Sequence, residues 1–373
     1  MTPSSILYQN ASKTIVLLDL PRSIEEAQVL SSSLARDVAL PRRLISAVPP
    51  NTPFPTPESK NTLPAPPSAQ VIADLMTAAA SGAALAEIHQ SHSGPWVLPR
   101  IYSHAQSSFP TTSSSTSSTT STSPSQSQLP STSLPSIPSP PYLPPKSHSL
   151  AGTISSHRSQ ILSLSPNFFH LILLDPPWPN RSAKRKRRGA AAYQPAPDFL
   201  YLRDLLSLIP VTSHLATNGL IAVWVTNSAR AVETLTSPSG IFAEWGVELV
   251  GEWTWLKVTT GGEPLVGLEA TWRRPWERLL IARKRGGQGG PVPGKVVMAV
   301  PDVHSRKPSL RALLEELLPV EYQALEVFAR NLTAGWWSWG DEVLLFQGRE
   351  HWVEMTLADD AADAGPGCLD HTS

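Results

Sequence analysis

The chain has 373 residues with a formal net charge of zero, 38 prolines, 16% charged residues and a single cysteine. A neutral chain has no overall field that would favour nucleic acid or a membrane, so a charged partner must be bound locally. One cysteine excludes a disulfide framework and a cysteine-based zinc site, which fits a reducing compartment.

The N-terminus, MTPSSILYQN, lacks the charged segment and long apolar core of a signal peptide. No apolar run approaches the roughly 20 residues that cross a bilayer. We therefore expect a soluble intracellular protein that does not contact a membrane.

Residues 1–101 contain short strand and helix patterns. The apolar run Ile15–Leu18 is stopped by Pro21, and Ser23 followed by Glu26 has the spacing of a capping box that starts a helix. Residues 49–68 resemble a Pro-rich linker, and residues 70–90 form an Ala-rich helical segment. No function follows from this region.

Residues 102–149 are dominated by Ser, Thr and Pro, and no Asp, Glu, Lys or Arg occurs between Tyr102 and Pro145. Such a segment buries too little apolar surface to offset chain entropy, so we expect it to be disordered. Residues 357–373 resemble an acidic, frayed tail. The compact domain is therefore expected at residues 150–356, which hold all but one of the 12 tryptophans.

Within that domain, apolar runs predict strands separated by helical patterns. The predicted strands are 168–174, 219–226, 247–258, 277–283, 295–300, 323–329 and 342–347. The predicted helices are 198–216, interrupted at Pro210, then 228–236 and 310–318, the last capped by Ser309. Alternating strands and helices, with several strands continuously apolar, predict an α/β sheet covered on both faces.

The first predicted strand ends in Asp175-Pro176-Pro177-Trp178. Ligands of such sheets lie beyond the carboxyl ends of strands, where Asp175 would project. Two prolines make a rigid turn without N–H donors, and Trp178 offers a flat face for stacking. Together they suit a planar ring with an exocyclic amine, whose two N–H groups a carboxylate and a proline carbonyl could accept. The alternative is a buried strand that ends in a turn, with Trp178 in the core.

This tetrapeptide resembles the signature of the MT-A70 family of N6-adenosine methyltransferases, and the second half is similar to its methyltransferase-like protein 4 branch. Matching stretches in the family's order span about 168–347: FFHLILLDPPWPNRSAKR, IAVWVTN, GEWTWLKVTTGGEPL, RRPWERLLIAR, VPDVHSRKPSLRALLEELLP and LEVFARNLTAGWWSWGDEVLLF. ILYQNASKTIVLLDLPRSIEEAQ resembles the start of fungal members. The resemblance implies a Rossmann-like domain with a mixed, mostly parallel sheet, and methyl transfer from S-adenosylmethionine to adenine N6.

The resemblance also implies site residues. Asp175 through Trp178 would be catalytic, with Asp175 also near the cofactor. Arg330 and Asn331 would contact the cofactor's polar end, Asp341 and Glu342 its ribose hydroxyls, and Lys307, before Pro308, would border it. Without the family, Arg330 could be a surface charge and Asp341-Glu342 an ordinary turn. His304 could be a base, although a loop histidine is the simpler interpretation.

Two features depart from the family pattern. Members usually carry an acid just before the catalytic strand, near the cofactor adenine, whereas AGTISSHRSQILSLSPNFFHLILL contains neither Asp nor Glu. Backbone groups could take its place. The Ser/Thr/Pro tract also interrupts the region just upstream, either as an insertion or as an artefact of the gene model.

A basic run follows the tetrapeptide. Asn180 and the cluster Lys184, Arg185, Lys186, Arg187 and Arg188 could grip phosphates beside the target base, serve as a nuclear localisation signal, or form a solvated loop. Tyr193 could stack on a flanking base or pack locally. RGGQGGPVPG, 285–294, lies between two strands and does not open a helix, so it predicts a flexible loop and not a phosphate loop.

The main hypothesis is an RNA methyltransferase in the nucleus, acting on an adenosine of small nuclear RNA, because the branch resemblance implies that substrate. DNA is an alternative, since no motif identified here reads the 2′-hydroxyl. A non-catalytic nucleic-acid-binding scaffold is the second class, although inactive family members have lost the tetrapeptide. No metal is expected, and the sequence does not indicate an oligomeric state.

Overall fold

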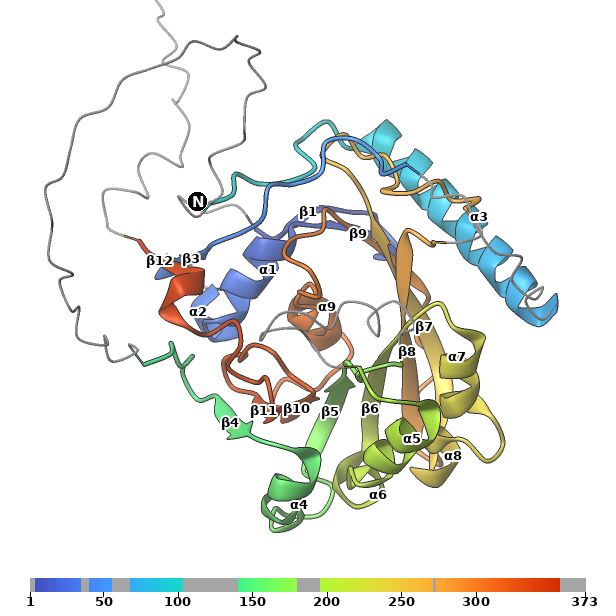
Figure 1. The fold of residues 1–373 in the computed structure, drawn as a ribbon, viewed down its shortest axis with the longest axis vertical. Helices are drawn as coiled ribbons and strands as arrows, with labels where there is room; N and C mark the ends of the chain where they lie inside the picture. Colours follow the sequence, from blue (N-terminus) through green and yellow to red (C-terminus); the bar gives the residue numbers. More distant parts are fainter. Residues whose placement is uncertain are drawn as a thin grey trace, which may run out of the picture.

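The computed structural model describes residues 4–34, 40–55, 68–102, 140–179, 195–270 and 273–355. Its centre is a ten-stranded sheet with the order β1-β2-β9-β7-β8-β6-β5-β10-β11-β4 (Figure 1). The half from β6 to β4 is entirely parallel. In the other half β8 is antiparallel to both of its neighbours, and β1 is antiparallel to β2. A mixed, mostly parallel sheet was expected and is confirmed.

The strands of this sheet are β1 (Ile6–Gln9), β2 (Ile15–Leu18), β4 (His148–Ala151), β5 (Phe169–Leu174), β6 (Leu215–Val225), β7 (Val247–Lys257), β8 (Trp276–Lys284), β9 (Lys295–Ala299), β10 (Ala324–Val327) and β11 (Trp337–Gly340). A second, two-stranded sheet pairs β3 (Arg42–Leu44) with β12 (Trp352–Glu354). The helices are α1 (Leu20–Ala27), α2 (Ser31–Leu34), α3 (Ser68–Ser91), α4 (Ile154–Leu162), α5 (Phe199–Ser207), α6 (Val211–His214), α7 (Ala229–Thr236), α8 (Ile241–Glu244) and α9 (Arg311–Glu315).

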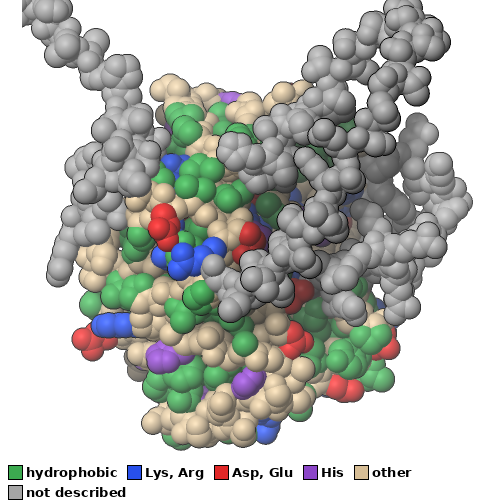
Figure 2. All heavy atoms as spheres, turned by 60° about the vertical axis from the view of Figure 1, so that its left-hand side comes forward, with side chains coloured by type: hydrophobic (Ala, Val, Ile, Leu, Met, Phe, Trp, Pro, Cys, Tyr) green, Lys and Arg blue, Asp and Glu red, His purple; other side chains and the backbone are tan. Residues whose placement is uncertain are grey.

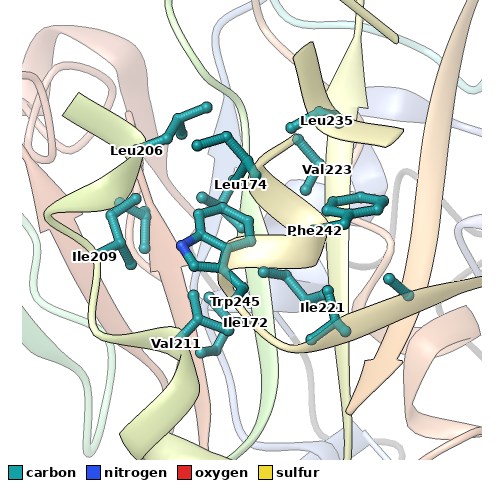
Figure 3. Close-up of a cluster of buried hydrophobic side chains, with 14 of the residues drawn as sticks. Ile172, Leu174, Leu206, Ile209, Val211, Ile221, Val223, Leu235, Phe242 and Trp245 are labelled. Carbon is teal, nitrogen blue, oxygen red and sulfur yellow. The ribbon is translucent and has the colours of Figure 1, made fainter. Parts of the chain in front are cut away.

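Helices cover both faces of the sheet. On one face, α4, α5, α7 and α8 enclose a core around β5 and β6, in which Phe242 and Trp245 pack among Ile172, Leu174 and Ile221 (Figure 3). On the other face, α1 and α9 pack through Leu20, Ile24, Leu313 and Leu314. Because β5 is buried from both sides, its sequence is continuously apolar instead of alternating.

Three local predictions were wrong. The run 342–347 was expected to be a strand, but it forms turns, and the strand is β11 just before it. A short apolar run has no periodicity that separates these cases, and Val343 packs instead with Ala329 and Leu332. Helix α1 begins before Ser23, because Asp19 caps it by accepting from the Arg22 N–H at 2.9 Å. Helix α9 begins after Leu310 and has no side-chain cap hydrogen bond.

The predicted segment boundaries also differ from the structure. Strands β1 and β2 join the main sheet, with β2 parallel to β9, so part of residues 1–101 belongs to the same sheet as β5. Strand β4 begins at His148, inside the segment expected to be disordered, because it pairs with β11 and buries Leu150. Most of the Ser/Thr/Pro tract and of the tail lies outside the described residues.

Helix α3 runs along the outside of the sheet (Figure 1). By length and composition, Ala69–Ser91 could cross a membrane, with a mean hydropathy of 1.5, although the sequence was expected to contain no such segment. The helix is attached to the sheet by one stripe, in which Ala78, Ala84 and Ile88 are buried. Asp74 on this helix also pairs with Arg274 at 2.8 Å. These contacts hold the helix against the rest of the protein.

Candidate active site

The topology places a crevice beside Asp175. From β5 the chain continues through α5 to β6 on one side, whereas from β10, the other neighbour of β5, it continues to β11 in the opposite direction. Ligands of open α/β sheets bind at such a switch point, beyond the carboxyl ends of the strands. Asp175 directly follows β5 at this position.

Asp175 lies between two cations. One carboxylate oxygen is 3.4 Å from Lys307 Nζ, and the other is 3.8 Å from a terminal nitrogen of Arg330. The Asp175 side chain keeps 16% of its surface exposed, so it is accessible from a cavity. The structure therefore brings together three residues that are far apart in the sequence and that were predicted to share a site.

The ion pairs continue along the carboxyl edge of the sheet. Lys307 Nζ also lies 2.8 Å from Glu277, and Glu277 lies 2.5 Å from Lys257 at the end of β7. Burial alone would raise the pKa of Glu277, but the two lysines outweigh it and hold that pKa well below its usual range. Burial would lower the pKa of Lys307, but Asp175 and Glu277 raise it above its ordinary value, so this lysine is charged at neutral pH.

Arg330 connects the loops that follow β10 and β11. Its Nε donates to Glu342 at 3.1 Å, and a terminal nitrogen donates to the Ser305 carbonyl at 3.0 Å. Two residues of this region have left-handed backbone conformations, Phe328 with φ 60° and Ser305 with φ 66°. Such a conformation is strained for a bulky residue such as Phe328, and strain of this kind is concentrated at binding sites.

Two cavities meet at Asp175. The larger, about 720 Å³, is bounded by the start of α4, the segment that leads into α5, and Asp341 and Glu342 after β11. The smaller, about 40 Å³, is lined by Lys307, Asn331 and Glu326 among others. Asp175, Phe328 and Arg330 line both. The larger volume lies within the range of small-molecule sites, roughly 300–1,000 Å³.

Glu326 on β10 is a site residue that sequence reasoning missed. It pairs in register with Leu173, two residues before Asp175, so both acids project from the same face of the sheet. Burial, and then the negative charge of Asp175, raise the pKa of Glu326 to about 8, although Arg330 opposes the shift. At neutral pH this carboxyl group is mostly protonated.

We expect Glu326→Gln to reduce the dependence of stability on pH. Between the usual pKa of 4.5 and about 8, the folded chain binds more protons at Glu326 than the unfolded chain does. The free energy of unfolding of the native protein should therefore fall as pH rises through this window, and a glutamine removes that loss. Urea unfolding at about pH 5 and about pH 8 should show the variant gaining relative to the native protein at the higher pH.

Glu350→Gln serves as a control, because the Glu350 side chain is 73% exposed. An advantage of Glu326→Gln that is equal at both pH values would contradict the raised pKa.

The structure corrects the stacking role expected of Trp178. Its indole is 4% exposed, belongs to the core beneath α5, and donates its N–H to the Trp224 carbonyl at 2.7 Å. The N–H pairs with a strand carbonyl of β6, so the ring faces inward and presents no surface to a ligand. The Pro176 carbonyl accepts from the Trp178 N–H and the Pro177 carbonyl from the Ala196 N–H, each at 2.8 Å.

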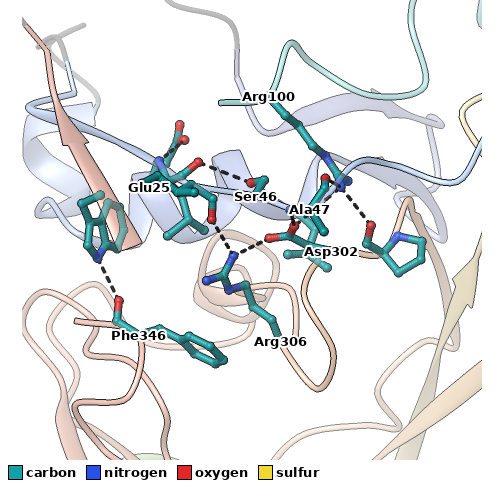
Figure 4. Close-up of polar contacts among 12 residues, drawn as sticks. Glu25, Ser46, Ala47, Arg100, Asp302, Arg306 and Phe346 are labelled. Carbon is teal, nitrogen blue, oxygen red and sulfur yellow. Dashed lines mark hydrogen bonds and ion pairs between the residues drawn. The ribbon is translucent and has the colours of Figure 1, made fainter. Parts of the chain in front are cut away.

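The N-terminal region holds the loop that carries Lys307. Asp302 in this loop pairs with Arg306 at 2.6 Å, lies 3.6 Å from Arg100, and accepts from the Ala47 N–H at 2.7 Å (Figure 4). All three charged side chains are at most 1% exposed. Residues before position 101 thus fix the loop between β9 and α9, a role that their sequence did not indicate. His304 in the same loop is exposed and lines neither cavity.

The predicted nucleic-acid contacts Asn180, Lys184, Arg185, Lys186, Arg187 and Arg188, together with Tyr193, lie outside the described residues. The described chain stops at Pro179 and resumes at Pro195, and both Pro177 and Pro195 line the larger cavity. The described residues on either side of the basic run therefore lie beside this cavity. On the face drawn in Figure 2, basic and acidic side chains of the described residues lie next to each other, and neither sign covers a broad area.

The residues that line the two cavities include groups of the kinds that S-adenosylmethionine would need. The small cavity offers cations, Lys307 and Arg330, and acids, Glu326 and Asp175, as a zwitterionic amino acid requires. Asp341 and Glu342 at the end of β11 can accept from vicinal ribose hydroxyls. Among the described residues, no group of three or more His, Cys, Asp or Glu side chains could hold a metal ion.

The sequence profile of the MT-A70 family matches residues 169–342. Over 94% of both chains, this protein is 48% identical to a protein of Cryphonectria parasitica named N6-methyladenosine RNA methyltransferase MTA1. It is 34% identical to human N(6)-adenine-specific methyltransferase METTL4, over 57% of this chain and 45% of the human one. A Caenorhabditis elegans protein named DNA N6-methyl methyltransferase is 35% identical over 56% of this chain and 54% of its own.

Proposed function

This chain belongs to the MT-A70 family, and on that premise we propose that it transfers a methyl group from S-adenosylmethionine to adenine N6 in RNA. The observation that carries the proposal is the intact Asp175-Pro176-Pro177-Trp178 at a switch point, where Asp175 opens to both cavities. A scaffold that had lost catalysis would not need this acid exposed between two cations.

Two groups of described residues would bind two different regions of the cofactor. Lys307 and Arg330 face its carboxylate, with Asn331 in the same small cavity, while Glu326 and Asp175 face its ammonium group. Asp341 and Glu342 would accept from its ribose hydroxyls in the larger cavity. When bound, S-adenosylmethionine supplies an electrophilic methyl group on a positively charged sulfur.

Asp175 positions the amine of the target adenine. Its carboxylate accepts one N–H, the Pro176 carbonyl accepts the other, and the nitrogen lone pair is thereby aimed at the methyl group. A new C–N bond forms as the methyl–sulfur bond breaks, and the amine then releases one proton. That proton is strongly acidic, so positioning and hydrogen bonding supply the catalysis without a strong general base.

RNA is the favoured polymer. The relative named for RNA matches nearly the whole chain, whereas the one named for DNA matches about half. An adenine must be unpaired or flipped out of a duplex to reach such a site. A small nuclear RNA remains part of this proposal because the branch resemblance implies it. A nuclear location also remains part of it, because the basic run resembles an import signal.

The test is transfer of tritiated methyl from S-adenosylmethionine to matched RNA and DNA oligonucleotides, followed by nucleoside analysis. Label in N6-methyladenosine from RNA would support the proposal. Label recovered from DNA alone would replace RNA by DNA as the substrate. Binding of the RNA without any transfer, and without heat on addition of S-adenosylmethionine, would identify a scaffold.

Replacing Lys184, Arg185, Lys186, Arg187 and Arg188 by serine is expected to weaken RNA binding and flatten its salt dependence. Each lost phosphate contact should reduce the slope of log affinity against log salt by about one. Fluorescence anisotropy over a range of salt concentrations measures this slope. The control changes Lys284 and Arg285, at the end of β8 remote from Asp175, to serine. An unchanged slope in the five-residue variant would leave nuclear import or a solvated loop as its role.

A further inference from the structure

One end of the larger cavity is not yet assigned to any group of the cofactor or of the target base. It lies between the start of α4 and the start of α5 and is lined by Thr153, Ile154 and Ser155 on one side and by Tyr201 and Leu205 on the other. Asp341 and Glu342, the expected ribose acceptors, line the same cavity. Because the proposed function directs the amino acid of the cofactor toward the small cavity, the base attached to that ribose would occupy this end.

Among the described residues that line this cavity, the only carboxylates are Asp175, Asp341 and Glu342, and the proposed function already assigns all three to other groups. Between Lys146 and Pro197 the sequence contains one acidic residue, Asp175, and that residue is engaged with Lys307 and Arg330. The next acid, Asp198, accepts from the Tyr201 N–H at 2.8 Å as the cap of α5. The Thr153 hydroxyl is likewise used to cap α4, accepting from the Ser156 N–H at 3.0 Å.

Tyr201 supplies an aromatic face instead. It lies in the first turn of α5, its backbone is fixed by the Asp198 cap, and its side chain remains 52% exposed beside the cavity. Ile154 lines the α4 side of the same cavity, but it is only 3% exposed and offers little surface of its own. Aromatic rings bind purine faces by stacking, and stacking does not depend on the exocyclic substituent.

We propose that Tyr201 stacks on the adenine of S-adenosylmethionine, and that this site recognises the purine by its face and shape, not by a carboxylate on its amine. The inference rests on the proposed function, and it explains how this chain would hold the purine although Asp175 is the one acidic residue between Lys146 and Pro197. It also predicts tolerance of a changed substituent at the purine 6-position.

Calorimetry with S-adenosylhomocysteine and its deaminated analogue, S-inosylhomocysteine, tests the proposal on the full chain. Tyr201→Ala should bind S-adenosylhomocysteine about tenfold more weakly, and Tyr201→Phe should bind it nearly as well as the native protein. The native protein should bind the inosyl analogue within about threefold of the adenosyl compound. Leu200→Ala is the matched control, since Leu200 is 69% exposed in the same turn and does not line the cavity.

Each other outcome has a defined meaning. If the native protein binds S-adenosylhomocysteine and Tyr201→Ala binds it equally well, the stacking role is overturned while the proposed function stands. If Tyr201→Ala loses affinity for RNA alone, Tyr201 contacts the nucleic acid and the proposal is overturned. A loss above about tenfold for the inosyl analogue would show that the amine is read directly. A native protein that binds neither compound would overturn the proposed function as well.

Discussion

Asp175→Asn is expected to abolish methyl transfer while the fold survives. The amide keeps the size of the side chain, but it lacks the negative charge and presents one donor where the target amine needs an acceptor. Removing one preorganised polar group from an active site lowers kcat by about 10²-fold or more. Methyl transfer to an RNA oligonucleotide at saturating cofactor, normalised to folded protein, measures the loss.

The fold should tolerate this change because the neighbouring charges keep partners. Lys307 remains 2.8 Å from Glu277, and Arg330 remains 3.1 Å from Glu342. The midpoint of urea unfolding should therefore shift little. Asp204→Asn, an exposed acid on α5, is the matched control and should retain full activity. Activity of Asp175→Asn within about threefold of the native protein would refute the assigned role.

Asp175→Glu separates charge from position in the same assay. The longer side chain restores the carboxylate but moves it by roughly one methylene group, and a displacement of about 1 Å in an active site can cost about 10²-fold. We therefore expect little recovery. Full recovery would mean that charge near the cofactor suffices, and that orientation of the amine by Asp175 is unimportant.

The sequence predicted the position of Asp175 from a local property. Asp175 follows an apolar run that could be recognised as a strand, and ligands of α/β sheets lie beyond such strand ends. Asp341 and Glu342 were assigned through the family resemblance alone, because the strand near them was misplaced to 342–347. In the structure they follow Gly340, the last residue of β11.

Residues whose role depends on cross-strand neighbours were missed. Glu326 and Glu277 lie within apolar strands, and their significance comes from Asp175 and Lys307, which are far away in sequence. They lie in the stretches LEVFARN and RRPWERLL. An acid inside an apolar strand is unusual, and it could have indicated a functional residue. Trp178 was expected to stack on a ligand, but it lies in the core for a related reason. The direction of a side chain after two prolines depends on the geometry of the turn, which the sequence does not specify.

The position of the N-terminal region also depends on contacts between residues far apart in the sequence. Short apolar segments separated by a Pro-rich stretch suggested a separate part, yet β2 pairs with β9, and Arg100 binds the loop that carries Lys307. Pairing between strands about 280 positions apart cannot be read from either strand alone. The near-complete match to the fungal relative agrees with this arrangement, because it includes the N-terminal region and not the catalytic half alone.

Arg330→Met should have the second largest effect, on cofactor binding. Methionine preserves much of the length and apolar volume but removes a cation that is 8% exposed and contacts Asp175, Glu342 and the Ser305 carbonyl. Truncating one partner of a buried, hydrogen-bonded charge pair costs about 3 kcal/mol, so affinity for S-adenosylmethionine should fall about 100-fold. Calorimetry with S-adenosylhomocysteine measures this without turnover.

Arg330→Lys and Arg349→Met complete the experiment. A lysine retains the charge, but it lacks the planar fork that reaches Glu342 and the Ser305 carbonyl together, so we expect only partial recovery, about tenfold weaker than native. Arg349 is 48% exposed and pairs with Glu354 at 3.5 Å, and its loss should leave affinity unchanged. If Arg330→Met bound the cofactor as well as Arg349→Met, the cation would serve the fold alone. The carboxylate of the cofactor would then have to be held by other polar groups that line the small cavity, among them Lys307, Arg311 and Asn331.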